Sequence, residues 1–198
     1  MGWWASPSTR SPLMSATDAP LIATAPDTAP DRQGDVAVAA PVASTVIPVK
    51  NARGIIGRVL DAVLAQDAPW AFDVLVIDSG STDGTLEVLR RYPSVRVLEI
   101  PPESFGHGRT RNLGVERTQG EFIVFLTHDA IPADRAWLRN LVAPMLRDRC
   151  VAGVFGRHIA HAGASPCVVR DLELHFEGLR AAGDVLRMDD PQRYAADV

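Results

Sequence analysis

Cysteine is scarce in this sequence of 198 residues, which contains only Cys150 and Cys167. Two thiols cannot build the disulfide framework of a small secreted domain, and their spacing matches none of the common zinc-binding patterns. The scarcity therefore excludes a disulfide-rich fold and a zinc finger. We interpret both cysteines as reduced, structural thiols of a cytoplasmic protein.

An excess of basic charge is also absent. The chain has 20 Lys and Arg against 24 Asp and Glu, a formal net charge of −4, which offers no broad electrostatic footprint for nucleic acid. No apolar stretch approaches the roughly 20 residues that cross a bilayer, and residues 1–4 do not begin a secretory signal. We predict no nucleic-acid partner, no transmembrane segment and a cytoplasmic location, with peripheral contact at the inner face of the membrane left open.

Large apolar side chains are sparse before residue 42. Residues 1–41 contain six prolines, nine alanines and eight serines or threonines, a composition that cannot offset the entropy lost when the backbone is ordered. The sequence therefore predicts a disordered leader over 1–41 and a folded domain over 42–198.

From residue 42 onward, short β-branched runs alternate with stretches whose apolar residues recur at helical spacing. The predicted strands are 44–49, 73–77, 94–100 and 121–126, and the predicted helices are 54–66, 85–91, 110–118, 137–146 and 167–180. This order predicts an α/β fold with a mostly parallel sheet and helices on both faces. We also expect Pro144 to kink or shorten its helix and residues 150–155 to add a strand.

Polar stretches follow each of the four predicted strands. Because ligands of open parallel sheets bind beyond the carboxyl ends of the strands, we expect these stretches to line one edge of the sheet. Asp78, at the end of a buried strand, can accept hydrogen bonds from a base or ribose, and the alternative is that it caps the following turn. For Asp83 and the serines of residues 79–84, the turn interpretation is favoured.

The third polar stretch combines glycines with two cations, since Gly106-His107-Gly108-Arg109 is followed by Arg111-Asn112. Free backbone N–H groups and the helix dipole at such a helix start favour an anion such as phosphate. The spacing is neither that of a dinucleotide fingerprint nor that of a P-loop. A solvated helix face is an equally good explanation for Arg109 and Arg111.

The fourth polar stretch, Thr127-His128-Asp129, ends a hydrophobic strand and brings Asp129 to the same edge. Mg²⁺ typically takes one or two carboxylates together with substrate phosphates, so Asp129 is our metal candidate. The competing role of helix cap fits Asp134 better. His128 is a candidate polar contact, although a lone histidine is more often structural.

Four segments follow one another in a specific order: VIPVKN at 46–51, VIDSGSTDGT at 76–85, GRTRNLG at 108–114 and FLTHDA at 125–130. Together they resemble the nucleotide-binding half of family 2 glycosyltransferases with the GT-A fold, over residues 42 to about 160. The similarity is strongest to members that transfer rhamnose or similar sugars, which carry Thr-Gln-Asp-Ala at the fourth strand.

The resemblance implies an inverting transfer of a sugar from a nucleoside diphosphate to a hydroxyl of a glycan or lipid-linked acceptor, with Mg²⁺ or Mn²⁺ as cofactor. It implies that Asp78 holds the nucleobase, that Asp129 ligates the metal, and that residues 109–112 lie along the diphosphate. The residues expected to contact the donor are Pro48, Val49, Asn51, Asp78, Gly80, Gly108, Arg109, Asn112 and His128.

The sequence departs from the family pattern in two places. The usual acidic triplet of the metal loop is Thr127-His128-Asp129, which leaves one carboxylate. The acceptor-activating carboxylate of such enzymes lies in a second half, so the catalytic base is unassigned, with Asp190 as a weak candidate in a segment more typical of a turn. We expect a truncated domain that binds donor and transfers poorly, and the alternative is a noncatalytic nucleotide-sugar-binding module.

Overall fold

The structure, a computed structural model, describes residues 40–181, 183 and 185. Most of the predicted leader lies outside these residues, and so does the candidate base Asp190. The first regular element begins at Ala43, next to the predicted start of the folded domain.

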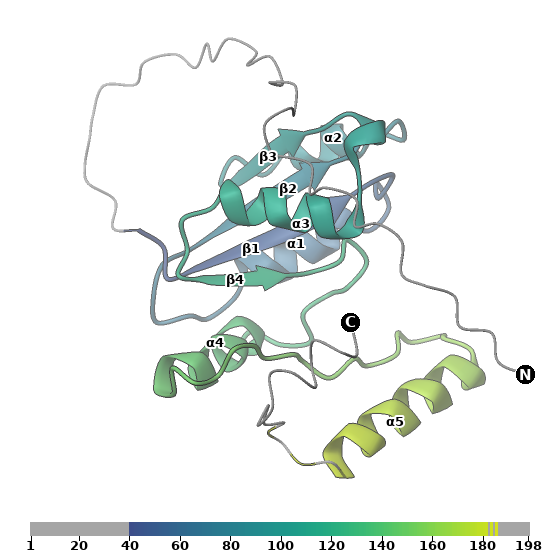
Figure 1. The fold of residues 1–198 in the computed structure, drawn as a ribbon. Helices are drawn as coiled ribbons and strands as arrows, with labels where there is room; N and C mark the ends of the chain where they lie inside the picture. Colours follow the sequence, from purple (N-terminus) through teal and green to yellow (C-terminus); the bar gives the residue numbers. More distant parts are fainter. Residues whose placement is uncertain (1–39, 182, 184, 186–198) are drawn as a thin grey trace, which may run out of the picture. The chain divides into compact units, whose positions relative to one another are not determined.

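Four strands form one sheet in which every neighbouring pair is parallel (Figure 1). They are β1 (Ala43–Val49), β2 (Phe72–Asp78), β3 (Val95–Glu99) and β4 (Phe122–Phe125), and their spatial order is β3-β2-β1-β4. The helices are α1 (Ile56–Leu64), α2 (Thr85–Leu89), the 3₁₀ turn η1 (Pro102–Ser104), α3 (His107–Glu116), α4 (Trp137–Arg147) and α5 (Pro166–Ala181). The predicted parallel α/β fold is confirmed.

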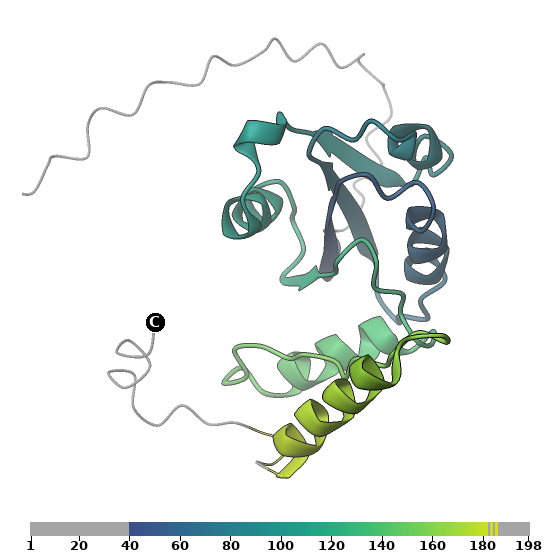
Figure 2. The same ribbon diagram turned by 90° about the vertical axis from the view of Figure 1, so that its right-hand side faces the viewer.

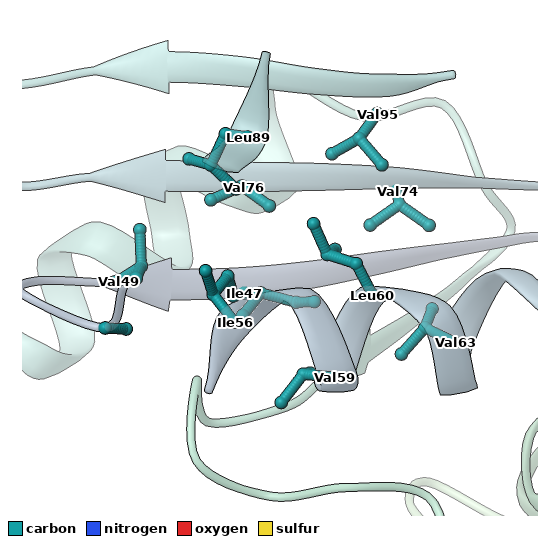
Figure 3. Packing of buried hydrophobic residues seen from close by; sticks show 11 residues of the cluster. Ile47, Val49, Ile56, Val59, Leu60, Val63, Val74, Val76, Leu89 and Val95 are labelled. Atoms are coloured by element: carbon teal, nitrogen blue, oxygen red, sulfur yellow. The ribbon is translucent and has the colours of Figure 1, made fainter. Parts of the chain in front are cut away.

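Helices cover both faces of the sheet, with α1 and α2 on one side and α3 on the other (Figure 2). The alternation of side chains along β1 supplies both layers, because Ile47 joins the cluster under α1 whereas Val46 lies in the cluster on the opposite face. In Figure 3, Leu60 of α1 packs with Ile47 of β1 and with Val74 and Val76 of β2. Burial of these branched side chains is the main source of the sheet's stability.

Helix α3 approaches β1 closely because it presents a glycine at the contact. A Cβ atom on the buried Gly114 would lie 2.5 Å from Cγ1 of Val46, and Val46 is fully buried. No real Cβ contact is that short, so α3 can occupy this position only while residue 114 has no side chain.

A polar network fixes the amino end of the sheet, opposite the predicted site. The Ser44 hydroxyl donates to Oδ1 of Asp73 at 2.5 Å and accepts from the Gly120 amide at 3.0 Å. Arg96 binds Oδ2 of Asp73 at 2.8 Å and the Arg117 carbonyl at 2.9 Å. The network therefore ties the first residues of three strands to the end of α3.

Helix α4 contains Pro144, where we expected a kink or an early end. The helix continues through Pro144 to Arg147, so the early end is wrong. Leu138 and Val142 are fully buried in a cluster with Ala43, and this burial offsets the backbone hydrogen bond that proline cannot donate.

Two further expectations fail in the second half of the chain. Residues 150–155 form no strand, and Phe155 is 66% exposed. Cys150 and Cys167 are free, as expected, but both are exposed, so neither belongs to a core.

Within residues 40–181, 183 and 185, no helix has the length and apolar character required to span a membrane.

Gly114→Ala is expected to destabilise the protein by about 1–3 kcal/mol, because the added methyl group must displace Val46 or α3. Gly108→Ala is the matched control in the same helix, since nothing lies within 4 Å of a Cβ atom there. Urea unfolding followed by circular dichroism measures both variants against the parent. Equal stabilities for the two variants would contradict the close packing of α3 on β1.

Candidate functional site

The parallel strands bring the carboxyl ends of β1 to β4 to a single edge of the sheet. Val49 pairs with Asp78, Asp78 pairs with Glu99, and Val46 pairs with Phe125. The polar stretches after the four strands therefore begin at this edge, which is the arrangement expected from the sequence.

Asp78 divides its two carboxylate oxygens between two environments. Oδ1 accepts hydrogen bonds from the Gly80 and Ser81 amides, each at 2.9 Å, so the turn-capping interpretation is correct for that oxygen. Oδ2 is buried and has no hydrogen-bond partner among the described residues, and the residue as a whole is 1% exposed. An unpaired buried carboxylate oxygen is unfavourable. Oδ2 is therefore a candidate to accept a hydrogen bond from a ligand.

Asn51 joins the loops that follow β1 and β2. Its amide donates to the Ser81 hydroxyl at 2.8 Å, and its side-chain oxygen accepts from the Thr82 amide at 2.9 Å. Asn51 has a φ of 51°, a left-handed conformation that asparagine tolerates better than most residues. Its side-chain N–H groups make no hydrogen bond among the described residues.

Asp83 joins the same two loops from the other side. Its Oδ1 accepts from the Thr85 amide at 3.0 Å and the Thr85 hydroxyl at 2.6 Å, and its Oδ2 accepts from the Arg53 amide at 3.0 Å. The Thr85 hydroxyl also accepts from the Ala52 amide at 2.8 Å. The N-cap of α2 is Gly84, one residue beyond Asp83. The predicted turn role of Asp83 is confirmed.

Three other residues that we predicted to contact the nucleotide-sugar donor, Gly80, Val49 and Pro48, lie in or next to these loops. Gly80 has a φ of 83°, and a Cβ atom there would lie 2.6 Å from Pro102 Cγ, so only glycine fits. The Val49 side chain belongs to the core, and its carbonyl accepts from the amide and hydroxyl of Ser79. Pro48 is half-buried.

Helix α3 begins at His107, three residues earlier than predicted, with Gly106 as an N-cap that has no side-chain hydrogen bond. The first helical bond runs from the Thr110 amide to the Gly106 carbonyl, so the amides of the first turn need acceptors from outside the helix. Gly108, Arg109 and Asn112 are exposed. This start has the geometry of an anion site.

Asp129 lies in the loop between β4 and α4 and is exposed. The Ala130 amide closes a turn on the Thr127 carbonyl at 3.1 Å, and the His161 ring approaches the Asp129 carbonyl at 3.4 Å. The Asp129 carboxylate makes no ion pair within the described part of the chain. His128, its predicted neighbour in the site, is half-buried.

The described residues contain no group of three His, Cys, Asp or Glu side chains arranged to hold a metal. A cation at Asp129 therefore needs oxygens from a bound diphosphate and from water, a combination that Mg²⁺ and Mn²⁺ accept. The residues present fit a cation that binds together with a nucleotide and not a permanent protein cage.

Sequence reasoning missed Gln66, which is 8% exposed and bonds to both sides of the start of α4. One signal pointed to it. Gln66 follows Val63 by three residues and so stands on the apolar side of the helical pattern, where an amide must find hydrogen-bond partners.

A model of glycosyl transferase family 2 matches residues 44–167, which contain all four edge segments. The chain belongs to this family. Among curated family members, the O-antigen chain rhamnosyltransferase RfbN of Salmonella typhimurium is 38% identical over 132 residues, which cover 66% of this chain and 41% of RfbN. The similarity thus spans less than half of that relative.

Two solved structures of similar proteins share the fold. The mannosyltransferase PcManGT of Pyrobaculum calidifontis, in complex with GDP-Man and Mn²⁺, is 30% identical with a TM-score of 0.50, covering 63% of this chain and 36% of PcManGT. A fragment of S. aureus TarS in complex with UDP is 27% identical with a TM-score of 0.50, covering 60% of this chain and 38% of that one. The predicted family, the predicted sequence similarity to rhamnosyltransferases and the predicted fold are confirmed.

The hydrogen bonds of Asp83 make a pH dependence testable. The Thr85 hydroxyl, followed by the Arg53 amide, lowers the pKa of the Asp83 carboxyl. A lowered pKa means that the ionised carboxylate stabilises the folded state above its unfolded pKa, and that this contribution is lost as the pH falls through the folded pKa.

We therefore expect the parent to be more stable than Asp83→Asn near pH 7, with the difference shrinking below about pH 4. Urea unfolding of both proteins between about pH 7 and about pH 3 measures the difference. A difference that stays constant over this range would show that ionised Asp83 does not join the two loops.

Proposed function

We propose that the chain binds a nucleoside-diphosphate sugar at the carboxyl edge of the sheet and transfers its hexosyl group to an acceptor hydroxyl with inversion. The observation that carries the proposal is the unpartnered Oδ2 of the buried Asp78. It stands at the end of β2 beside the joined loops of residues 50–53 and 79–85, where a nucleoside enters such a sheet.

A ring N–H of a nucleobase can supply the donor that Oδ2 lacks. Uracil and thymine (N3–H) and guanine (N1–H) each carry such a group on the edge that base pairs, whereas cytosine and adenine do not. The related structures hold UDP in one case and GDP-Man in the other, and both bases meet this requirement. We therefore assign Asp78 to the nucleobase, with Pro48, Val49, Asn51 and Gly80 around the nucleoside.

The diphosphate lies between the start of α3 and the Asp129 loop in this proposal. The amides of the first turn of α3, with Gly108, Arg109 and Asn112, supply hydrogen-bond donors and positive charge. Asp129 would hold Mg²⁺ or Mn²⁺ together with the diphosphate, and His128 would be a further polar contact. When bound, the cation stabilises the negative charge that gathers on the leaving diphosphate.

The transfer forms a bond between the acceptor oxygen and the anomeric carbon while the bond from that carbon to the diphosphate breaks. The proton of the acceptor hydroxyl passes to a carboxylate base, which is unassigned; Asp190, outside the described residues, is a weak candidate. We propose a glycan or lipid-linked acceptor in polysaccharide biosynthesis, on the cytoplasmic side of the membrane, with residues 42–198 as the donor-binding part.

Turnover separates this function from that of a noncatalytic binding module. The purified chain is incubated with UDP, GDP and dTDP sugars, and released nucleoside diphosphate is measured alongside binding. Release above the uncatalysed rate supports a transferase. Saturable binding without release supports the module.

Asp129→Asn is expected to abolish the gain in UDP or GDP affinity that Mn²⁺ produces, because the amide is a much poorer cation ligand than the carboxylate. Titration calorimetry with and without Mn²⁺ measures this gain. Asp134→Asn is the matched control in the same loop, since the amide oxygen can still accept from Ala136 as Asp134 Oδ1 does now. A gain unchanged in Asp129→Asn would refute the metal role.

Asp78→Asn is expected to weaken UDP binding by about tenfold without any metal, because an amide N–H then meets the imide N–H of the base. CDP, whose base presents an acceptor at that position, should bind the variant no more weakly than the parent. Metal-free titrations with UDP and CDP measure both affinities, and thermal unfolding confirms the fold. UDP binding equal to that of the parent would exclude Asp78 from base recognition.

A further inference from the structure

The loop that carries Asp129 has few hydrogen bonds of its own. Over residues 126–136, the loop makes one internal backbone–backbone hydrogen bond, from the Ala130 amide to the Thr127 carbonyl, and one from the Ala136 amide to Asp134 Oδ1. At its start, the Leu126 amide donates to the Val46 carbonyl of β1 at 3.1 Å. The direction in which Asp129 points therefore depends on how the far end of the loop is held.

The far end is held by Gln66, just beyond the end of α1. Its Nε2 donates to the Asp134 carbonyl at 2.8 Å and to the Ala62 carbonyl at 3.0 Å, and its Oε1 accepts from the Leu138 amide at 2.8 Å. Both N–H groups and the oxygen are thus in use, and the side chain is 8% exposed. The geometry of three such partners suits a primary amide and no other side chain of this length.

A neighbouring backbone bond reinforces the same junction, since the Asp67 amide donates to the Arg135 carbonyl at 2.8 Å. The loop is also anchored by Leu126 and Ile131, which pack against the cluster under α1. Because α1 connects β1 to β2, Gln66 links the element that ends in Asp78 to the loop that contains Asp129.

From these contacts we infer that Gln66 is a positioning residue, which sets the place of the Asp129 carboxylate relative to the nucleoside side of the site. The part of this inference that concerns the metal and the nucleotide rests on the proposed function. The part that concerns the position of the loop rests on the hydrogen bonds alone. Gln66 itself stays buried and touches no substrate. Groups hydrogen-bonded directly to a metal ligand commonly change metal affinity by about tenfold to a hundredfold. Gln66 bonds the Asp134 carbonyl and not Asp129 itself, so we expect its effect at the lower end of that range.

Gln66→Glu is the sharpest test, because it keeps size and shape while placing a carboxylate against the Asp134 and Ala62 carbonyls. UDP and GDP affinities are measured by calorimetry with and without Mn²⁺. We expect the Mn²⁺-dependent gain to fall by about tenfold while the metal-free affinity equals that of the parent. Gln119→Glu, the same change at an exposed position, should leave both unchanged.

Two results would overturn the inference: a full Mn²⁺-dependent gain in Gln66→Glu, or equal losses with and without metal, which would indicate general destabilisation. Gln66→Met removes the same hydrogen bonds without adding charge, and serves if Gln66→Glu does not fold.

A ligand-free measurement separates this inference from the proposed function. Hydrogen–deuterium exchange of residues 127–136 should be faster in Gln66→Glu than in the parent, with strand β2 unchanged. If the parent binds no nucleotide, or binds it without a Mn²⁺ effect, the proposed donor site fails, and the exchange data alone decide whether Gln66 positions the loop. Unchanged exchange in this loop would refute the role of Gln66.

Discussion

The parallel alignment of four strands around β1 is the constraint on which the site depends. β1 has β2 on one side and β4 on the other, so the carboxyl ends that bear Asp78 and the Asp129 loop stand on either side of the central strand. Reversing any one strand would move its exit loop to the opposite edge. The chemistry proposed for the edge is thus a property of strand direction before it is a property of any side chain.

Within that frame, Asp78 keeps one carboxylate oxygen in an unfavourable state. Oδ1 accepts two amides of the turn, whereas Oδ2 is buried without a partner among the described residues. Buried polar atoms are nearly always paired in folded proteins, and exceptions concentrate where a ligand completes them. The branched apolar side chains under α1 and the polar network around Asp73 stabilise the fold. This stability offsets the cost of leaving Oδ2 without a partner.

Much of the fold followed from periodicity, because strands and amphipathic helices differ in the spacing of their apolar residues. The failures have a common cause in contacts distant along the chain. Residues 150–155 have strand-like composition but pair with neither edge strand of the sheet, β3 or β4, and Pro144 is tolerated because its neighbours on α4 are buried.

The site shows the same division. The position of Asp78 was predictable from the end of a buried run, as was the turn around Asp83. The division of labour between the two oxygens of Asp78 was not, because it depends on the folded turn. The hydrogen bond from Gln66 to Asp134 joins residues 68 apart in sequence, and nothing local in the sequence indicates such a partner.

The loops that follow β1 and β2 form a single structural unit. Four hydrogen bonds run between residues 51–53 and 81–85, so neither loop has a conformation independent of the other. A chimera that takes only one of these loops from a relative with another donor preference would lose these hydrogen bonds. Donor specificity in this fold is therefore expected to be transplanted, in the laboratory or in evolution, as a pair of loops together.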